Sequence, residues 1–354
     1  MSGGVDSSVA AKLTLDAGFE CIGCMMKLYD NPDVLSDGTA VKSKTCCSTD
    51  DAEDARNVAF RLGMQFYVFN YKDEFRSCVI DNFTDCYLNG MTPNPCIECN
   101  RCLKFGHLLE RGKVLGCEYV VTGHYARIEE RDGEMVLLKG LDSSKDQSYV
   151  LYMLTQDQLR HIRFPLGNLS KTEVRRIAEE NGFINAHKKD SQDICFVPDG
   201  DYAAVVERYT GGDSGFSPGN FVNMDGKILG KHKGIVHYTV GQRKGLGISA
   251  EKPLYVHHID VPNNEVVLSD NADLFSSEVY VPFLSLTTER GLKDGSRCSA
   301  KIRYHHKEQP GTVKMKGAGC IFTFDEPQRA ITPGQSLVLY DGDRVLGGGI
   351  IGKL

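Results

Sequence analysis

The first 125 or so residues alternate between strand-like and helix-like patterns, and this alternation constrains the fold of the 354-residue chain more than any other feature. In residues 51–62, for example, Ala55, Val58 and Leu62 recur at helical spacing, and Gly63 follows as a stop signal. The pattern predicts strands at 21–28, 66–69 and 118–122, and helices at 9–17, 51–62, 75–88 and 103–115. Strands that alternate with helices pair in parallel, so we expect an α/β fold with a doubly wound parallel sheet and a ligand site at the carboxyl ends of its strands.

The remainder of the chain has a different pattern. Ser170 and Glu173 have the spacing of a capping box, which predicts the start of another helix. From about residue 211 glycines are frequent, and short alternating runs are separated by turn signals such as Asp341-Gly342, as in a β-barrel. We therefore expect three domains: an N-terminal α/β domain over 1–200, a small central domain over 201–268, and a C-terminal β-barrel-like domain over 269–354.

The composition is that of a folded globular protein, with 41% hydrophobic and 25% charged residues. No run of 18 apolar residues and no signal-peptide pattern is present, so we expect a cytoplasmic protein without a membrane partner. The 13 cysteines, about 4% of the chain, are too few for a disulfide-stapled secreted scaffold and are expected to be reduced. Residues 1–90 carry 14 acidic and 8 basic side chains and account for the net charge of −6, so a nucleic acid can bind only at local basic patches of the neutral remainder.

The first predicted helix opens with the string SGGVDSS at residues 2–8. Two glycines let the backbone approach a ligand closely, and successive N–H groups at a helix N-terminus form an anion site. Asp6 alone would repel a phosphate, so its position implies a bridging Mg²⁺. The string lacks the lysine of a Walker loop. An ordinary glycine-containing helix start is the alternative, but seven residues in this order favour a phosphate-binding loop.

Three cysteines, Cys96, Cys99 and Cys102, follow a turn-forming Thr-Pro-Asn-Pro stretch, and Cys195 lies in a second polar stretch. Polar residues surround the first three, so we expect a partly exposed loop in which Arg101 or a helix N-terminus lowers the thiol pKa. Seven other cysteines lie mostly in apolar runs or stand alone, and we expect them to be small buried side chains: Cys21, Cys24, Cys78, Cys86, Cys117, Cys298 and Cys320. The adjacent pair Cys46-Cys47 precedes a predicted helix, and its role stays open.

Seven strings, in order along the chain, resemble those of the tRNA-specific 2-thiouridylases, or tRNA-uridine 2-sulfurtransferases, a family of the pyrophosphate-loop ATPase superfamily. They are SGGVDSS, TPNP-x-x-x-C-N, TGHYAR, GLDSSKDQSYVLY, KKDSQDICF, HYTVGQRKGLGI, and TPGQSLVLY followed by LGGGII. The resemblance covers essentially the whole chain. It implies that ATP adenylates the C2 oxygen of the wobble uridine in tRNAs for Lys, Glu and Gln, that a cysteine persulfide delivers sulfur, and that AMP and pyrophosphate are released.

The resemblance also implies roles for individual residues. Cys195 matches the cysteine that carries the persulfide, and Cys99 matches a partner nucleophile that forms a disulfide with Cys195 or frees sulfide from its persulfide. The implied ATP contacts are Met1, Ser2, Gly3, Gly4, Val5, Asp6, Ser7, Ser8, Met26 and Gly123. The implied contacts to tRNA or to the target base are Asn94, Pro95, Cys96, His124, Lys145, Asp146, Gln147, Arg303, Tyr304 and Gln335. Mg²⁺ and a sulfur donor, either a cysteine desulfurase or a sulfur-relay protein, complete the implied system.

Two departures from the family's pattern leave alternatives open. Relatives usually have a strand just before the SGGVDSS loop, whereas here the loop follows Met1, so we expect that strand to lie upstream or to be missing. Many relatives have Asp at the position of Cys96, and a thiol cannot simply take over the role of a carboxyl group. Besides persulfide chemistry, which ranks first, Cys96, Cys99 and Cys195 can hold a [4Fe–4S] cluster, or a structural zinc with Cys102 as fourth ligand.

Some of these residues also have simpler interpretations. His124 can be a structural histidine, Met26 a core methionine, and residues 145–147 a solvated loop. Residues 227–252 carry six basic side chains against one acidic, and residues 301–305 predict a strand with one basic face; both suit phosphates. Two other functions stay open, an amidating ligase with the same phosphate loop and a metal-stabilised RNA-binding protein without catalysis.

Overall fold

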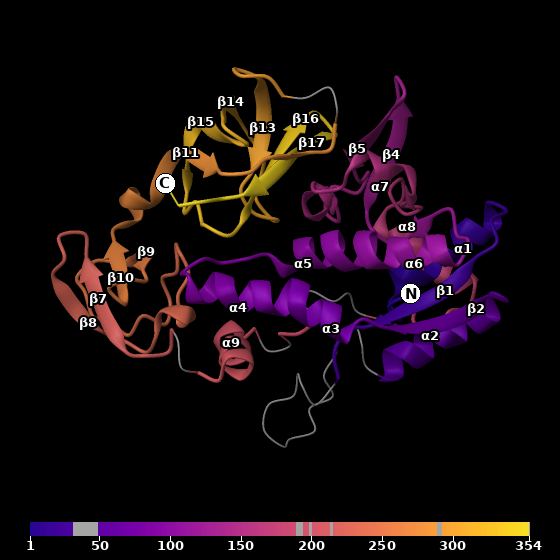
Figure 1. Cartoon of the computed structure of the whole chain (residues 1–354), viewed down its shortest axis with the longest axis horizontal. Coiled ribbons are helices and arrows are strands. Elements are labelled where there is room, and N and C mark those ends of the chain that lie inside the picture. The colour runs from indigo at the N-terminus through magenta and orange to yellow at the C-terminus, as the bar shows by residue number, and fades with distance from the viewer. Residues whose placement is uncertain (31–48, 189–193, 198–199, 213–214, 289–291, 354) are drawn as a thin grey trace.

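The computed structural model describes residues 1–30, 49–188, 194–197, 200–212, 215–288 and 292–353 (Figure 1). Its architecture is mixed α/β at the N-terminus and β-rich toward the C-terminus, as the sequence predicts. The adjacent pair Cys46-Cys47 and most of the polar stretch before Cys195 lie outside the described residues. No described helix is both long and apolar enough to span a membrane.

The N-terminal part contains two pairs of parallel strands. β1 (Ile22–Lys27) pairs with β2 (Gln65–Asn70), and β3 (Val120–Val121) pairs with β6 (Ile162–Arg163). The first three of these strands fall within two residues of the predicted positions, and the parallel pairing confirms the α/β prediction. The described strands form two separate pairs rather than one continuous sheet, and the Met1 ammonium group donates a hydrogen bond to the carbonyl of Cys24 in β1.

Helices cover these strands. α1 (Val5–Asp16) starts inside the SGGVDSS string, four residues earlier than predicted, and α2 (Thr49–Arg61) matches the predicted helix closely. α8 (Lys171–Glu180) begins at the predicted capping box, in which the Ser170 side chain accepts a hydrogen bond from the Glu173 N–H. The other short helices are η4 (Ser148–Leu151), α7 (Gln156–Arg160), α9 (Tyr202–Thr210), η5 (Ile235–His237) and η6 (Asn271–Leu274).

Two long composite helices run side by side across the centre of the molecule (Figure 1). The first consists of α3 (Lys72–Phe75), the π-helical η2 (Arg76–Ile80) and α4 (Asp81–Leu88). The second consists of α5 (Pro95–Glu98), the π-helical η3 (Cys99–His107) and α6 (Leu108–Val114). The second helix starts eight residues before the predicted residue 103, so the cysteine motif is helical and the prediction of a polar loop there is wrong.

The reason for the early start is a local cap. The Asn94 side chain accepts a hydrogen bond from the Cys96 N–H at 3.2 Å, and Pro95 occupies the first helical turn, where its missing N–H costs nothing. The Asn-Pro pair is therefore a helix-start signal, although it also resembles a turn.

The central and C-terminal regions form two further sheets. The smaller sheet has the order β8-β7-β10-β9, with β7 (Gly219–Asn223), β8 (Ile228–His232), β9 (Tyr255–Asp260) and β10 (Glu265–Ser269). The larger sheet has the order β11-β15-β14-β13-β16-β17-β5-β4, and β12 also pairs with β17. Its C-terminal strands are β11 (Phe275–Val281), β12 (Ser285–Leu286), β13 (Arg297–Lys301), β14 (Gln309–Lys316), β15 (Gly319–Arg329), β16 (Ser336–Asp341) and β17 (Arg344–Ile350).

The larger sheet is completed by a hairpin from the N-terminal region. β4 (Ala126–Arg131) and β5 (Glu134–Lys139) pair with each other, and β5 pairs with β17 through Arg344 and Leu138. The Lys139 N–H also donates to the Asp343 carbonyl at 2.9 Å. The N-terminal and C-terminal parts therefore share a sheet, which the sequence pattern does not predict.

Candidate active site

The SGGVDSS loop is held tightly against α2. Gly3 has a φ of +72°, and a Cβ added there would lie 2.4 Å from the Asp51 carbonyl oxygen, so only glycine fits. The hydroxyl groups of Ser7 and Ser8 donate to the Gly4 carbonyl at 3.0 and 3.1 Å. Gly4 is the N-cap of α1 and supplies no side-chain cap, so no capping side chain occupies the N–H groups of the first turn. This leaves a loop of the kind that binds anions at a helix N-terminus.

Asp6 in this loop has a lysine partner. The Lys171 ammonium group lies 2.7 and 2.8 Å from the two Asp6 carboxylate oxygens, and the Tyr125 hydroxyl donates to one of them at 2.9 Å. The Lys171 side chain is 11% exposed and the Asp6 side chain 33%, so this ion pair is partly shielded from water. The negative charge of Asp6 is therefore paired with a positive charge from the same chain.

Two further polar side chains anchor the loop. The Asn185 amide donates to the Gly3 carbonyl at 3.0 Å and to the Ser8 hydroxyl at 2.9 Å. Lys188 contacts Asp51 at 2.5 Å and Asp54 at 2.7 Å. Burial disfavours the charged amine, but the hydrogen bonds from these two carboxylates outweigh it and raise the pKa of Lys188.

These anchoring residues are not among those that the sequence motifs point to. Tyr125 and Lys188 fall inside two of the seven family strings, which is the signal that could have pointed to them. Lys171 stands at a predicted helix start, and nothing in its own neighbourhood in the sequence links it to Asp6, 165 residues away.

Gly123 packs directly against the loop, because a Cβ there would lie 2.7 Å from the carbonyl carbon of Asp6. His124 is buried and hydrogen-bonds Thr122 at 2.7 Å, and its ring packs on Phe105 and Phe164. Burial, with a smaller contribution from a nearby lysine, holds its pKa well below the usual value. This geometry fits a structural histidine, the simpler of the two interpretations, and the contact of His124 with tRNA stays a prediction.

The candidate catalytic cysteines come from the second central helix, which carries Cys96 and Cys99, and from the segment at 194–197, which carries Cys195. Cys96 is exposed, whereas Cys99 and Cys195 are half-buried against the main core. The Tyr29 hydroxyl donates to the Cys195 carbonyl at 2.8 Å. The next residue, Phe196, packs edge-on against Phe75 and Phe83 of the α3–α4 helix at ring distances of 5.6 and 5.1 Å.

The α3–α4 helix packs against η3, which begins with Cys99, so the structure brings both candidate cysteines to the same pair of helices. Met26, an implied ATP contact at the end of β1, is half-buried against the same core, as its simpler interpretation has it. Arg101, one of the two groups that the sequence offers as a cause of a lowered thiol pKa, pairs with Glu98 at 2.6 Å.

The sequence leaves two metal sites open, a [4Fe–4S] cluster and a structural zinc, and the structure bears on each of them in a different way. In the described part of the chain, Cys96, Cys99 and Cys195 are not among the side chains that lie close enough together to share a single metal ion. This spacing does not test a [4Fe–4S] cluster, whose cysteines bind different iron atoms, so the cluster stays a prediction. Cys102 forms a disulfide with Cys78, so its sulfur is not a free thiolate that could complete the predicted zinc site. The expectation that all cysteines are reduced, and that Cys78 is an isolated buried side chain, is thus wrong for this pair.

Two of the residues implied in tRNA binding, Gln335 and Tyr304, lie close to the segment that contains Thr92 and Cys96. Gln335 donates to the Thr92 carbonyl at 2.8 Å, which ties the C-terminal sheet to this turn. Burial, followed by the nearby charges of Asp146 and Cys96, raises the pKa of Tyr304 to about 12. Arg303 donates to the Arg329 carbonyl at 2.8 Å.

Two predictions about these residues are wrong. The Asp146 side chain is only 6% exposed and accepts hydrogen bonds from Gly140 and Ser148, so it organises its loop rather than facing solvent. Gln147 likewise accepts from the Tyr125 N–H at 3.0 Å. β13 ends at Lys301, which is largely buried beside Asp146 and Glu308, so residues 301–305 do not form a strand with a basic face.

The six basic side chains of 227–252 are all exposed.

Comparisons with known proteins agree along the whole chain. Residues 1–199 match the family model "tRNA methyl transferase HUP domain", 207–270 match its "PRC-barrel domain", and 279–351 match an "Aminomethyltransferase beta-barrel domain". The tRNA-specific 2-thiouridylase MnmA of Clostridioides difficile (strain 630) is 49% identical over 100% of this chain and 97% of its own length. Proteins of the same name from Acetivibrio thermocellus and Clostridium acetobutylicum are 49% and 46% identical, each over 99% of this chain and 97% and 98% of their own length. The chain therefore belongs to the tRNA-specific 2-thiouridylase family.

Proposed function

We propose that this protein is the enzyme that replaces the C2 oxygen of the wobble uridine in tRNAs for Lys, Glu and Gln with sulfur, at the expense of ATP. The observation that carries the proposal is full-length similarity to 2-thiouridylases together with an SGGVDSS loop shaped for an anion. Both parts are needed, because the loop by itself would also suit an amidating ligase.

The loop residues fit ATP. Glycine at positions 3 and 123 lets the loop pack closely against Asp51 and against the strand end at Gly123, which fixes its shape. The first turn of α1 has no side-chain cap and offers N–H donors to an anion. Lys171 adds a positive charge beside Asp6, and the Asp6 carboxylate would hold Mg²⁺. Bound Mg²⁺ would supply charge neutralisation on the phosphates. The chemistry of this step is transfer of AMP to the C2 oxygen with loss of pyrophosphate, which turns a poor leaving group into a good one.

The sulfur step uses the two half-buried cysteines. The terminal sulfur of a persulfide on Cys195 attacks C2, and AMP leaves with the original oxygen. The Cys99 thiolate then attacks the Cys195 sulfur; a Cys99–Cys195 disulfide forms as the electrons of the broken S–S bond pass to the uridine sulfur. A reductant must restore both thiols, and a cysteine desulfurase or sulfur-relay protein must reload Cys195.

The tRNA contacts would come from the helix start at Asn94, Pro95 and Cys96, from Lys145 and its loop, and from Arg303, Tyr304 and Gln335. The link between Gln335 and Thr92 supports this grouping, because it holds the C-terminal sheet beside the helix that carries Cys96 and Cys99. An RNA-modifying enzyme must hold its target base out of the stack, and such a junction suits that task.

The test separates adenylation from sulfur transfer. Purified protein, undermodified tRNA, ATP, Mg²⁺ and a persulfide donor are combined anaerobically, and pyrophosphate release and mercury-retarded thiolated tRNA are both measured. Cys195→Ser should lose thiolation and keep pyrophosphate release, whereas Lys171→Met should lower pyrophosphate release by about 100-fold. Cys86→Ser and Lys12→Met are matched controls from the same regions. Pyrophosphate release without sulfur incorporation by the unmodified protein contradicts the proposal.

A further inference from the structure

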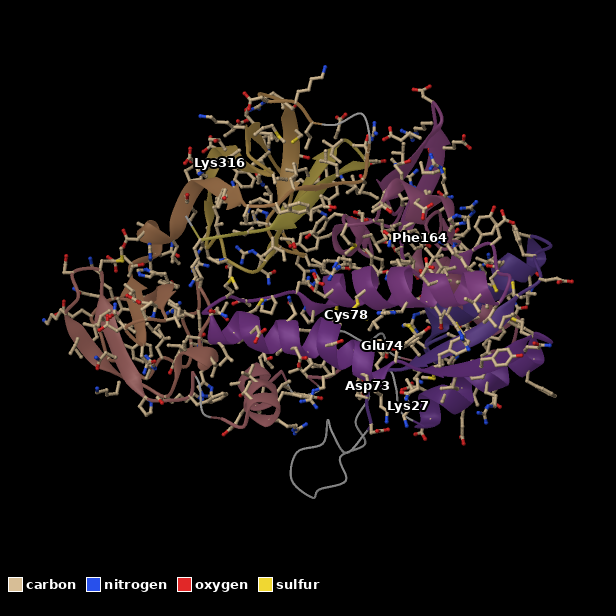
Figure 2. All side chains as sticks on the ribbon, viewed as in Figure 1. Lys27, Asp73, Glu74, Cys78, Phe164 and Lys316 are labelled. Atoms are coloured by element: carbon tan, nitrogen blue, oxygen red, sulfur yellow. A yellow bond between two sulfur atoms is a disulfide. The ribbon has the colours of Figure 1, made fainter. Side chains whose placement is uncertain are left out.

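The disulfide between Cys78 and Cys102 lies apart from the candidate catalytic cysteines and has a histidine beside it. Two sulfur atoms and one ring nitrogen of His107 all lie within 4.8 Å of one another. Figure 2 shows Cys78 between the α3–α4 and α5–α6 helices. In the described part of the chain this is the one group of three such side chains at that spacing.

Local structure explains why the three side chains meet. Cys78 lies in η2, whereas Cys102 and His107 lie in η3, and both segments are π-helical. A π-helix bonds residue i to residue i+5, so Cys102 and His107, five residues apart, lie on one face of η3. η2 packs against η3, and the Cα atoms of Cys78 and Cys102 are 6.5 Å apart.

We propose that Cys78, Cys102 and His107 bind a zinc ion when the disulfide is reduced. Two thiolates and one imidazole are a ligand set that zinc prefers, and their total charge of −2 neutralises the ion. Cys78 and Cys102 are half-buried, while His107 is exposed, so the fourth coordination position faces solvent and takes water. Within the described residues no hydrogen bond occupies the ring nitrogens of His107, which leaves one of them available to the metal.

The exchange between the disulfide form and the zinc-bound form needs one external two-electron reductant. An external dithiol reduces the Cys78–Cys102 disulfide to two thiols and is itself oxidised to a disulfide. Zn²⁺ then displaces the two thiol protons and takes a lone pair from His107. The disulfide form has no free thiolates at these positions, so oxidation and metal binding exclude each other.

The consequence for the molecule follows from the position of the ligands. The ion would join η2 to η3, and η3 begins with Cys99, three residues before Cys102. Bound zinc would therefore stabilise the helix that presents Cys99 while leaving Cys99 itself uncoordinated.

The test uses the full-length protein, reduced with a phosphine, stripped of metal and titrated with Co²⁺ as a spectroscopic substitute for zinc. We expect one equivalent to bind with a thiolate-to-cobalt charge-transfer band and tetrahedral visible bands, and Zn²⁺ to displace it. Cys78→Ser and Cys102→Ser should lose the band, and His107→Gln should bind at least about tenfold more weakly. Cys86→Ser and Cys117→Ser are controls, and a Cys96→Ser/Cys99→Ser/Cys195→Ser triple variant should keep the band.

A second measurement covers variants that fail to fold. In the unmodified reduced protein, Zn²⁺ should protect Cys78 and Cys102, but not Cys86 or Cys117, from alkylation as read by peptide mass spectrometry. The proposal is overturned if the reduced protein shows no charge-transfer band, or if the band persists in Cys78→Ser/Cys102→Ser. It is also overturned if alkylation of Cys78 and Cys102 is the same with and without zinc. These outcomes do not depend on tRNA thiolation, so they are separate from the test of the proposed function.

Discussion

At the scale of single residues, the SGGVDSS loop is held by two kinds of contact: a tight backbone turn at Gly3, and side chains that come from distant parts of the chain. The order of residues 2–8 is a local signal, and Gly3 occupies a backbone conformation and a space that only glycine can take. Lys171 and Asn185 reach the loop from more than 160 residues away, and no local pattern encodes such a contact. His124 follows a strand, which favours a functional role, and it is also buried and in contact with Thr122, Phe105 and Phe164, which favours a structural one.

His124 should make the stability of the protein depend on pH. Its pKa is well below 6.5 in the folded state, chiefly through burial, so the unfolded chain takes up a proton that the folded protein refuses. The stabilisation is full above pH 6.5 and is lost as the pH falls toward the lowered pKa. Between pH 7.5 and 5.5 the unmodified protein should lose on the order of 1 kcal/mol more free energy of unfolding than His124→Gln.

Urea unfolding at the two pH values measures this difference. His187→Gln, which changes a side chain that is 84% exposed, is the matched control and should behave like the unmodified protein. Equal pH dependence in His124→Gln and the unmodified protein contradicts the prediction.

At the scale of elements, the sequence predicts a polar loop where the structure has the helix that carries Cys96 and Cys99, because Asn-Pro occurs both in turns and at helix starts. Polar neighbours made a loop the simpler interpretation, but the Asn94 side chain caps the helix and Pro95 fits its first turn. The two π-helical segments could not be predicted either, since a π-helix has no distinct residue pattern and depends on packing.

The cap predicts a measurable cost. Asn94→Ala should lower the free energy of unfolding by about 1 kcal/mol, whereas Asn94→Ser should retain most of it, because a serine oxygen can also accept from the Cys96 N–H. Chemical denaturation of the three proteins provides the values. A loss of the same size in both variants would mean that Asn94 acts through something other than its cap.

At the scale of the whole molecule, the charge distribution agrees with the sequence in one place and departs from it in another. The basic side chains of 227–252 are exposed, so that patch is available to phosphates, whereas Lys301 is largely buried with carboxylates. Burial decides which of these basic side chains can reach a phosphate. Burial depends on the pairing of strands that are distant in the sequence, and the local pattern of charges does not reveal that pairing.

The exposed patch predicts a salt effect. Arg243→Gln/Lys244→Gln should weaken tRNA binding, and it should reduce the slope of log affinity against log salt concentration by about 2, because each phosphate contact releases counterions. Filter binding at several salt concentrations measures the slope. Lys113→Gln, an exposed lysine on α6, is the control, and an unchanged slope in the double variant would exclude this patch from the tRNA interface.

The pairing of β5 with β17 bears on how the chain can be divided. A fragment that contains only the C-terminal strands would leave the backbone N–H and C=O groups of β17 near Arg344 without the partner that Leu138 and Lys139 provide. The ion pair between Arg344 and Glu134 at 2.9 Å would be lost with it. An uncovered sheet edge is a template for strands of other molecules, so such a fragment should self-associate. In the intact chain, the hairpin at 126–139 covers this edge and thereby opposes aggregation.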